Sequence, residues 1–246
     1  MKKFSRILSV SALSISLAFS SAAITNPVQA AAATQTQKET LQYNQSDFYN
    51  YMAYDALLLK RMENVTDKFE KATKNITDVS PEYITANKVF LKDLQAIEKK
   101  YKSYTIKNKD FAGLKTITAR SMKRITGLQS LTVQVLDTQD EKLALELDKQ
   151  LKDFDRLMDK DDKDYTTLAQ KIIKKYKIKR NAAINYAVYG DEGKTISPSV
   201  MSYIVKKGDS LASISKAFGV TASDLKKWNN LKANPKTGQK IKIQIK

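Results

Sequence analysis

The sequence predicts a mainly α-helical protein, in which an elongated bundle of four or five helices precedes a small domain with the order strand, helix, helix, strand. Its 246 residues include only 7 Gly and 4 Pro, too few for the many tight turns of an all-β fold. Apolar residues recur every three or four positions over most of the chain, which is typical of helices packed on one face. Beyond residue 200 short segments alternate instead, which indicates strands.

The first thirty residues have the pattern of a secretory signal peptide. Basic residues precede an apolar stretch from Ile7 to Ile24, and small residues end at Ala30, after which we expect cleavage. An uncleaved anchor is the alternative, but it needs about twenty strongly apolar residues, and serines dilute this stretch. No later apolar run is long enough to span a bilayer. We therefore expect a secreted protein with no transmembrane anchor after cleavage.

Composition excludes several kinds of chemistry. The chain has no His and no Cys, so disulfides, thiolate nucleophiles, Cys-type zinc sites and a histidine base are all absent. We expect no metal, no cofactor and no catalytic residues. The 43 Lys and Arg exceed the 26 Asp and Glu, giving a net charge of +17. For an exported protein the expected polyanions are anionic wall polymers rather than nucleic acid.

The bundle is predicted at residues 46–189, after a polar segment, residues 31–45, that we expect to be a flexible tail. A stripe of apolar side chains predicts a first helix of about seven turns. Asp55 falls within this stretch, and we expect it at the edge of the stripe. The stripe consists of Tyr51, Tyr54, Leu58, Met62, Val65, Phe69, Ala72 and Ile76.

Two further stripes predict the second and third helices. Ser80 as N-cap and Pro81 at the first helical position mark the start of the second helix. Antiparallel helices with short connections bury such stripes against each other. The second stripe consists of Tyr83, Ala86, Phe90, Leu94, Ile97, Tyr101 and Tyr104, and the third of Phe111, Leu114, Thr118, Ser121, Ile125, Leu128, Thr132 and Val135.

A capping box formed by Thr138 and Glu141 predicts the start of a fourth helix. The acidic run DKDDKD at residues 159–164 interrupts the apolar period, so we expect a solvated connection to a fifth helix. A calcium loop is the alternative, but Asp164 stands where such a loop needs Gly, and Gln170 where it needs Glu. The two stripes are Leu143, Leu147, Leu151, Phe154 and Leu157 or Met158, then Leu168, Ile172, Tyr176, Lys179, Ala183 and Tyr186.

A linker, residues 190–200, separates the bundle from the last predicted domain, residues 201–246. Ser210 is expected to cap a first short helix that Gly219 ends, and Thr221 to cap a second. In the second helix we expect Leu225 and Trp228 to be buried, with Trp228 in the core rather than stacked on a ligand. Strands starting at Tyr203 and at Ile241 complete the domain.

Four blocks of this last domain carry a family resemblance: YIVKKGDSL from Tyr203, ISKAFGV from Ile214, LKKWNNL from Leu225 and GQKIKI from Gly238. In order and spacing they resemble the LysM module. The resemblance covers residues 201–246 and does not extend to the helical region 46–189. It implies a βααβ fold that binds peptidoglycan or chitin-like glycans containing N-acetylglucosamine.

The resemblance also implies a shallow groove between two loops. Backbone groups and Asn side chains would supply the donor and acceptor that each acetamido group needs, and Leu would contact its methyl. Structural roles are the alternative, because Asp209 and Ser210 are able to cap a helix and Asn229 to shape a turn. Lys236 and Thr237 replace the aliphatic residue and the Pro often seen in the family. The implied walls are Gly208, Asp209, Ser210 and Leu211, and Asn229, Asn230 and Leu231.

These observations predict a non-catalytic, cell-wall-associated protein of a bacterium, with the helical region as an interaction domain for a protein partner that the sequence does not identify. The alternative is a peptidoglycan hydrolase tethered by the LysM-like domain. Without His or Cys it would need a carboxylate pair of the glycosidase kind. The eight Glu fall at solvent-facing helical positions or in polar segments, which disfavours such a pair.

Overall fold

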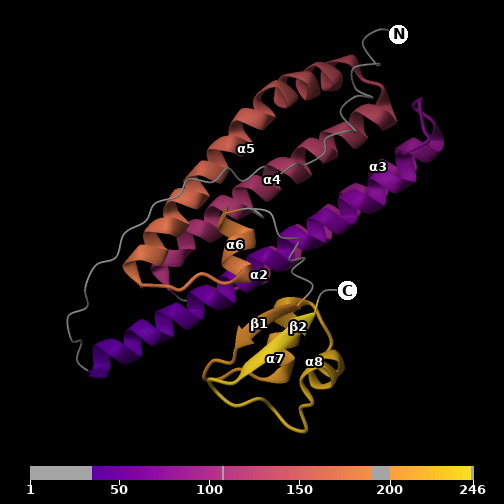
Figure 1. The fold of residues 1–246 in the computed structure, drawn as a ribbon. Coiled ribbons are helices and arrows are strands. Elements are labelled where there is room, and N and C mark those ends of the chain that lie inside the picture. Colours follow the sequence, from indigo (N-terminus) through magenta and orange to yellow (C-terminus); the bar gives the residue numbers. More distant parts are fainter. Residues whose placement is uncertain (1–34, 107, 190–199, 245–246) are drawn as a thin grey trace. The chain divides into compact units, whose positions relative to one another are not determined.

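The computed structural model of the protein describes residues 35–106, 108–189 and 200–244 (Figure 1). The mainly helical fold with a C-terminal βααβ domain is confirmed. The predicted signal peptide and residues 190–199 of the predicted linker lie outside the described residues. In chain order the elements are α2 (Gln35–Thr73), α3 (Pro81–Ser103), α4 (Lys109–Thr138), α5 (Glu141–Lys175), α6 (Ala182–Tyr189), β1 (Val200–Ile204), α7 (Leu211–Phe218), α8 (Ala222–Asn229) and β2 (Lys240–Gln244).

The described residues form two compact units. The first unit contains residues 61–103 and 116–165. The second contains residues 35–60, 104–115 and everything described after residue 165. Helices α2, α4 and α5 therefore each contribute one end to each unit. Among the described residues, no helix combines the length and the apolar character needed to cross a membrane.

In the first unit, α3 begins where the sequence predicts. The Ser80 hydroxyl accepts a hydrogen bond from the Tyr83 N–H at 3.3 Å, which satisfies one of the free N–H groups at the helix start. The apolar stripe of α3 is buried, and Phe90 stacks on Phe69 of α2 with ring centroids 4.7 Å apart. Asn87 is also buried in this stripe, where its side chain accepts a hydrogen bond from Gln129 at 2.9 Å.

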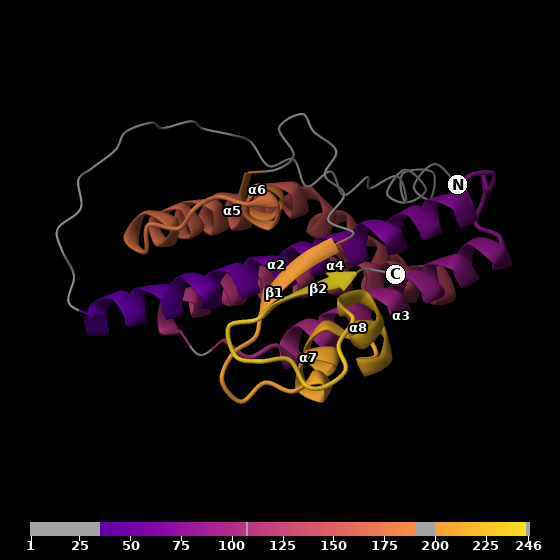
Figure 2. The same cartoon turned by 60° about the horizontal axis from the view of Figure 1, so that its bottom comes forward.

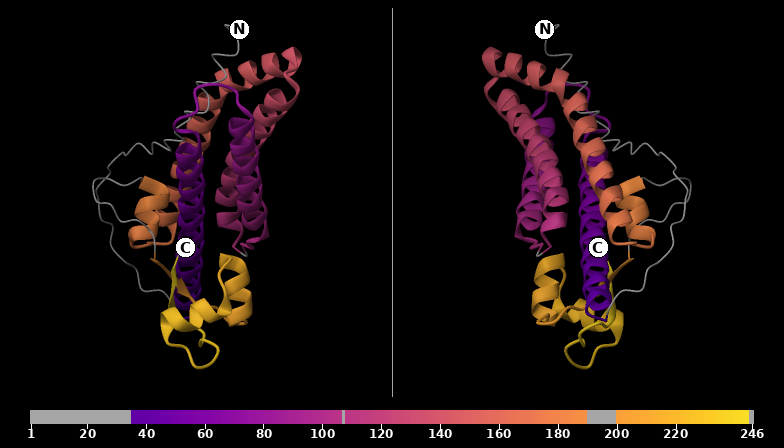
Figure 3. Two further views of the ribbon diagram at one scale, coloured as in Figure 1. Left: turned by 90° about the vertical axis from the view of Figure 1, so that its right-hand side faces the viewer. Right: turned by 90° about the vertical axis from the view of Figure 1, so that its left-hand side faces the viewer.

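The predicted capping box at the start of α5 is wrong by two residues. Helix α4 continues through Thr138, and the chain reverses at Gln139, which has a φ of 53°. The cap is Asp140, whose Oδ1 accepts hydrogen bonds from the N–H groups of Lys142 and Leu143 at 2.7 and 3.2 Å. Figures 1 and 3 show the resulting sharp reversal between α4 and α5.

The predicted break at residues 159–164 is also wrong, because α5 runs unbroken through the acidic run. Asp161 takes the stripe position between Phe154 and Tyr165 and is only 1% exposed. Its carboxylate accepts hydrogen bonds from Arg120 Nε at 2.7 Å and Arg124 Nε at 3.1 Å. A buried carboxylate is tolerated when it is paired and hydrogen-bonded, so two arginines of α4 allow the helix to continue.

The other acidic residues of the run occupy different environments. Asp164 lies at the surface and pairs with Lys160 at 2.8 Å. Burial, and then the nearby charge of Asp159, raise the pKa of Asp162 to about 6. A uniformly solvated connection is therefore not what forms here. The described residues contain no group of three or more acidic side chains arranged to hold a metal ion.

The predicted fifth helix is divided in two. Helix α5 ends at Lys175, and Lys177 adopts a φ of 49° in the turn that follows. A new helix, α6, starts where Asn181 Oδ1 accepts a hydrogen bond from the Ile184 N–H at 2.9 Å. Lys179, expected on the stripe, is exposed in this turn. The side chain of Tyr186 lies outside the described part of the structure.

Helix α2 starts at Gln35, so the prediction of a flexible tail is wrong for residues 35–45. No Gly or Pro occurs there to stop a helix, and two side chains tie it down. Asn44 accepts a hydrogen bond from Asn108 at 2.7 Å, and Gln45 donates one to the Tyr176 carbonyl at 2.9 Å.

Farther along α2, residues 51–58 are buried on every face rather than along one stripe. Asp55, expected at the edge of a stripe, is only 3% exposed. A ring from another part of the second unit lies against this segment: Tyr104 stacks on Tyr54 with ring centroids 4.1 Å apart and lies 6.2 Å from Tyr51. A helix that is apolar all round is normally a buried one, and the run YMAYDALL fits that rule.

Candidate glycan-binding site

The C-terminal domain is a two-stranded antiparallel sheet with two short helices (Figure 2). Tyr203 pairs with Ile241, and the side chains of both strands alternate between buried and exposed. The buried side of the sheet shares a core with apolar residues of α7 and α8, which confirms the predicted order of elements. The core residues are Met201, Tyr203, Ile241, Ile243, Leu211, Ile214, Phe218 and Leu225.

The first candidate wall is the loop from Val205 to Ser210. Asp209 shapes it, because Asp209 Oδ2 accepts hydrogen bonds from the Tyr203 hydroxyl at 2.6 Å and from the Lys206 N–H at 2.7 Å. Burial, and then the bond to Asp209, raise the pKa of Tyr203, so this hydroxyl remains a donor. Gly208 has a φ of 88°, a conformation that favours glycine. A Cβ at this position would meet no protein atom within 4 Å.

The end of the same wall is the start of α7. Ser210 caps the helix as predicted, in a reciprocal pair with Ser213: each hydroxyl accepts from the other residue's N–H, at 3.1 and 2.9 Å. Leu211 is buried, with 6% of its surface exposed. The side chains of Asp209, Ser210 and Leu211 are thus all engaged within the domain.

The second candidate wall follows α8. The Asn229 amide joins this helix to β2: its Nδ2 donates to the carbonyls of Leu225 and Lys242 at 2.9 and 2.8 Å, and its Oδ1 accepts from the Lys242 N–H at 2.6 Å. Asn230 ends the helix with a φ of 50°, and its side chain is exposed. Leu231 is half-buried.

A residue outside the predicted set links the two loops. Asn234 Oδ1 accepts a hydrogen bond from the backbone N–H of Leu211 at 3.3 Å. An Asn directly before Pro235 in a polar turn is a pair typical of turns, but no local pattern indicates that its partner is Leu211. Trp228, predicted to be buried, is only half-buried. Leu225, on the same eight-residue helix α8, is buried as predicted.

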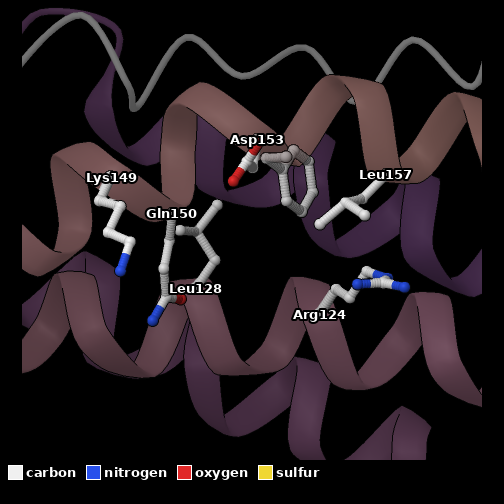
Figure 4. A pocket seen from close by; sticks show the side chains of 7 residues that line it. Arg124, Leu128, Lys149, Gln150, Asp153 and Leu157 are labelled. Carbon is white, nitrogen blue, oxygen red and sulfur yellow. The ribbon is translucent and has the colours of Figure 1, made fainter.

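A separate hollow lies in the first unit between α4 and α5 (Figure 4). Arg124 and Leu128 line it from α4, and apolar and polar side chains of α5 complete it. Among its lining residues the one carboxylate is Asp153, which is exposed and pairs with Arg156 at 2.8 Å. The hollow therefore does not contain the two carboxylates that a glycosidase mechanism uses.

The environments of the carboxylates are partly as predicted. Glu98 is an exception among the described Glu, because it is half-buried and pairs with Lys102 at 2.6 Å. In the described part of the chain the buried carboxylates are three aspartates that the apolar pattern does not predict to be buried: Asp47, Asp55 and Asp161. The exposed Glu are Glu63, Glu70, Glu82, Glu141 and Glu146.

Comparison with known proteins matches the C-terminal domain. A family model of the LysM domain matches residues 203–244. An N-acetylmuramoyl-L-alanine amidase, XlyA of Bacillus subtilis, is 57% identical over 30 residues, which are 12% of this chain and 10% of that protein. The membrane-bound lytic murein transglycosylase D of Escherichia coli K12 is 44% identical over 46 residues, 19% of this chain and 10% of its own.

The chain thus spans about a tenth of the length of the curated relatives it matches. No solved structure matches it. The matched family segment begins in β1 and ends with β2, so it coincides with the βααβ domain. Residues 203–244 of this chain belong to the LysM domain family.

Proposed function

We propose that the protein is an exported, non-catalytic cell-wall protein that binds N-acetylglucosamine-containing glycan, above all peptidoglycan, through its LysM domain. The observation that carries this proposal is the LysM match at residues 203–244. The names of the relatives describe enzymes that act on cell-wall material, but the chain resembles these proteins only over this segment. The helical region would then serve as an interaction domain for a protein partner.

We infer that the seven candidate residues have two kinds of role, since some hold the loops in shape and others contact the glycan. Asp209, Ser210 and Asn229 use their side chains to hold the loops in shape. The direct contacts to glycan would come from the backbone around Gly208 and from the side chains of Asn230 and Leu231. An exposed amide and a half-buried aliphatic side chain suit the polar and methyl parts of an acetamido group.

Two observations favour binding over hydrolysis. The chain has no His or Cys, and the hollow between α4 and α5 holds a single, exposed carboxylate among its lining residues. A retaining or inverting glycosidase needs two carboxylates on either side of the bond that breaks. A protein that only binds glycan needs neither a histidine or cysteine nor a pair of carboxylates.

Salt dependence tests the binding proposal. The described part of the domain exposes eight lysines, which should attract phosphate-bearing wall polymers over roughly 10 Å at 0.1 M salt. We expect the protein to sediment with peptidoglycan stripped of those polymers at low and high salt alike, and to gain extra retention on intact walls at low salt only. The lysines are Lys207, Lys216, Lys226, Lys227, Lys232, Lys236, Lys240 and Lys242.

Each arm of this experiment has its own meaning. Failure to sediment with stripped peptidoglycan would contradict glycan binding. Retention on intact walls that does not change with salt would show that the lysines only keep the domain soluble.

A further inference from the structure

Each outer edge of the LysM sheet is closed by an asparagine. At the edge of β2, the Asn229 amide bonds both the N–H and the carbonyl of Lys242. At the edge of β1, Asn50 does the same for Ile204: its Oδ1 accepts from the N–H at 2.8 Å and its Nδ2 donates to the carbonyl at 2.9 Å. Asn229 belongs to the LysM domain, but Asn50 belongs to α2. The helical region therefore satisfies the outward-facing backbone groups of β1 at Ile204.

Two neighbours of Asn50 on the same face of α2 also contact the domain. Asp47 lies one turn earlier and pairs with Lys206, with Asp47 Oδ1 and Lys206 Nζ 2.7 Å apart and both side chains largely buried. Tyr54 lies one turn later, and its ring meets Phe218 edge-on with centroids 5.6 Å apart. Spacings of three and four place these residues on one helix face.

These contacts fall at both ends of the structure that carries the first candidate wall. Ile204 is the last residue before the loop, and Lys206 lies within it. The backbone N–H of Lys206 also donates to Asp209, the residue that shapes the loop. Phe218 ends α7, which starts directly after the loop, and its ring meets Tyr203 at 5.2 Å. The face of α2 thus holds the strand before the loop and the helix after it.

We propose that the α2 face formed by Asp47, Asn50 and Tyr54 positions the glycan-binding loop of the LysM domain. The inference rests on the proposed function. A loop that is already held in its bound shape loses less conformational entropy on binding. Asn50 and Asp47 would be positioning residues: they raise the affinity for glycan without touching it. The helical region would then set how tightly the protein holds the wall.

The test uses the full mature chain and a soluble, uncharged N-acetylglucosamine oligomer, so that lysine charge plays no part. Asn50→Ala and Asp47→Asn should each weaken binding about three- to tenfold in calorimetry, because loop ordering then opposes binding. The matched control is Asn87→Ala, which removes another buried, hydrogen-bonded helical Asn, in the first unit. It should bind like the wild type.

Hydrogen exchange supplies a second readout. Asn50→Ala should speed exchange of the Ile204 amide, which loses its acceptor, and Asn87→Ala should not. Faster exchange at Ile204 with unchanged affinity would overturn the positioning role and leave the proposed function intact. Equal weakening by Asn87→Ala would overturn it too, because general stability would then explain the loss. No binding by the wild type would instead contradict the proposed function itself.

Discussion

Replacing Asp161 by alanine should lower the free energy of unfolding by about 2–3 kcal/mol. Removing one partner of a buried ion pair typically costs ~3–5 kcal/mol, but here the arginines are partly hydrated, since the side chains of Arg120 and Arg124 are 41% and 28% exposed. The loss should appear in urea unfolding followed by far-UV circular dichroism, with a lower midpoint at an unchanged slope.

The loss should also depend on pH. Burial alone would raise the pKa of Asp161, but hydrogen bonds from Arg120, Arg124 and Ser121 outweigh it, so the net effect lowers the pKa. A lowered pKa in the folded state means that the stabilisation is present above the ordinary value of 3.8 and is lost as pH falls through the folded-state value. The wild type and Asp161→Ala should therefore converge in strongly acidic solution.

A matched control comes from the same helix. Asp153→Ala removes a surface carboxylate that pairs with Arg156, and exposed pairs contribute only about 0–1 kcal/mol. Equal destabilisation by the two variants would contradict the role given to Asp161, and with it the explanation of why α5 continues through the acidic run.

Replacing Asn229 by alanine should destabilise the LysM domain by about 2–3 kcal/mol, since its side chain makes three hydrogen bonds worth ~1 kcal/mol each. A domain of this size has little stability to spare. We therefore expect glycan binding to fall more than tenfold in this variant. The loss of stability would be measured by following unfolding through the fluorescence of Trp228, because the only tryptophan of the chain lies in α8.

The neighbouring position separates structure from contact. Asn230→Gly removes an exposed amide while glycine keeps the left-handed backbone that ends α8. We expect an unchanged unfolding midpoint and weaker glycan binding. If Asn229→Ala instead unfolds like the wild type and only binding is lost, then Asn229 contacts the glycan directly and the assigned structural role is wrong.

Local signals in the sequence predicted much of this fold. Ser80, Ser210 and Thr221 cap the helices that they were expected to cap, because an N-cap depends on hydrogen bonds within a few residues. The spacing of apolar residues, which is about 3.6 in the helices and changes to 2 in strands after residue 200, likewise depends only on which side of an element is buried. The LysM domain was predictable for another reason, because four blocks of residues 201–246 resemble that family in order and spacing.

The failures concern residues whose state depends on distant partners. Asp161 looked like part of a solvated run, and only the arginines of α4, about forty positions away, make its burial acceptable. Asn50 gave no signal, because its partner Ile204 is 154 positions away. The periodic spacing of apolar residues indicates which side chains are buried, but it does not indicate which residues pack against them.

The proposal that this protein binds wall glycan without hydrolysing it is tested most directly by incubating the purified protein with isolated cell walls. Bound protein and released soluble sugar would be measured in the same samples. We predict that the protein sediments with the walls and that no sugar is released. Release that disappears when a single Asp or Glu is replaced would contradict the proposal and establish a carboxylate-dependent hydrolase.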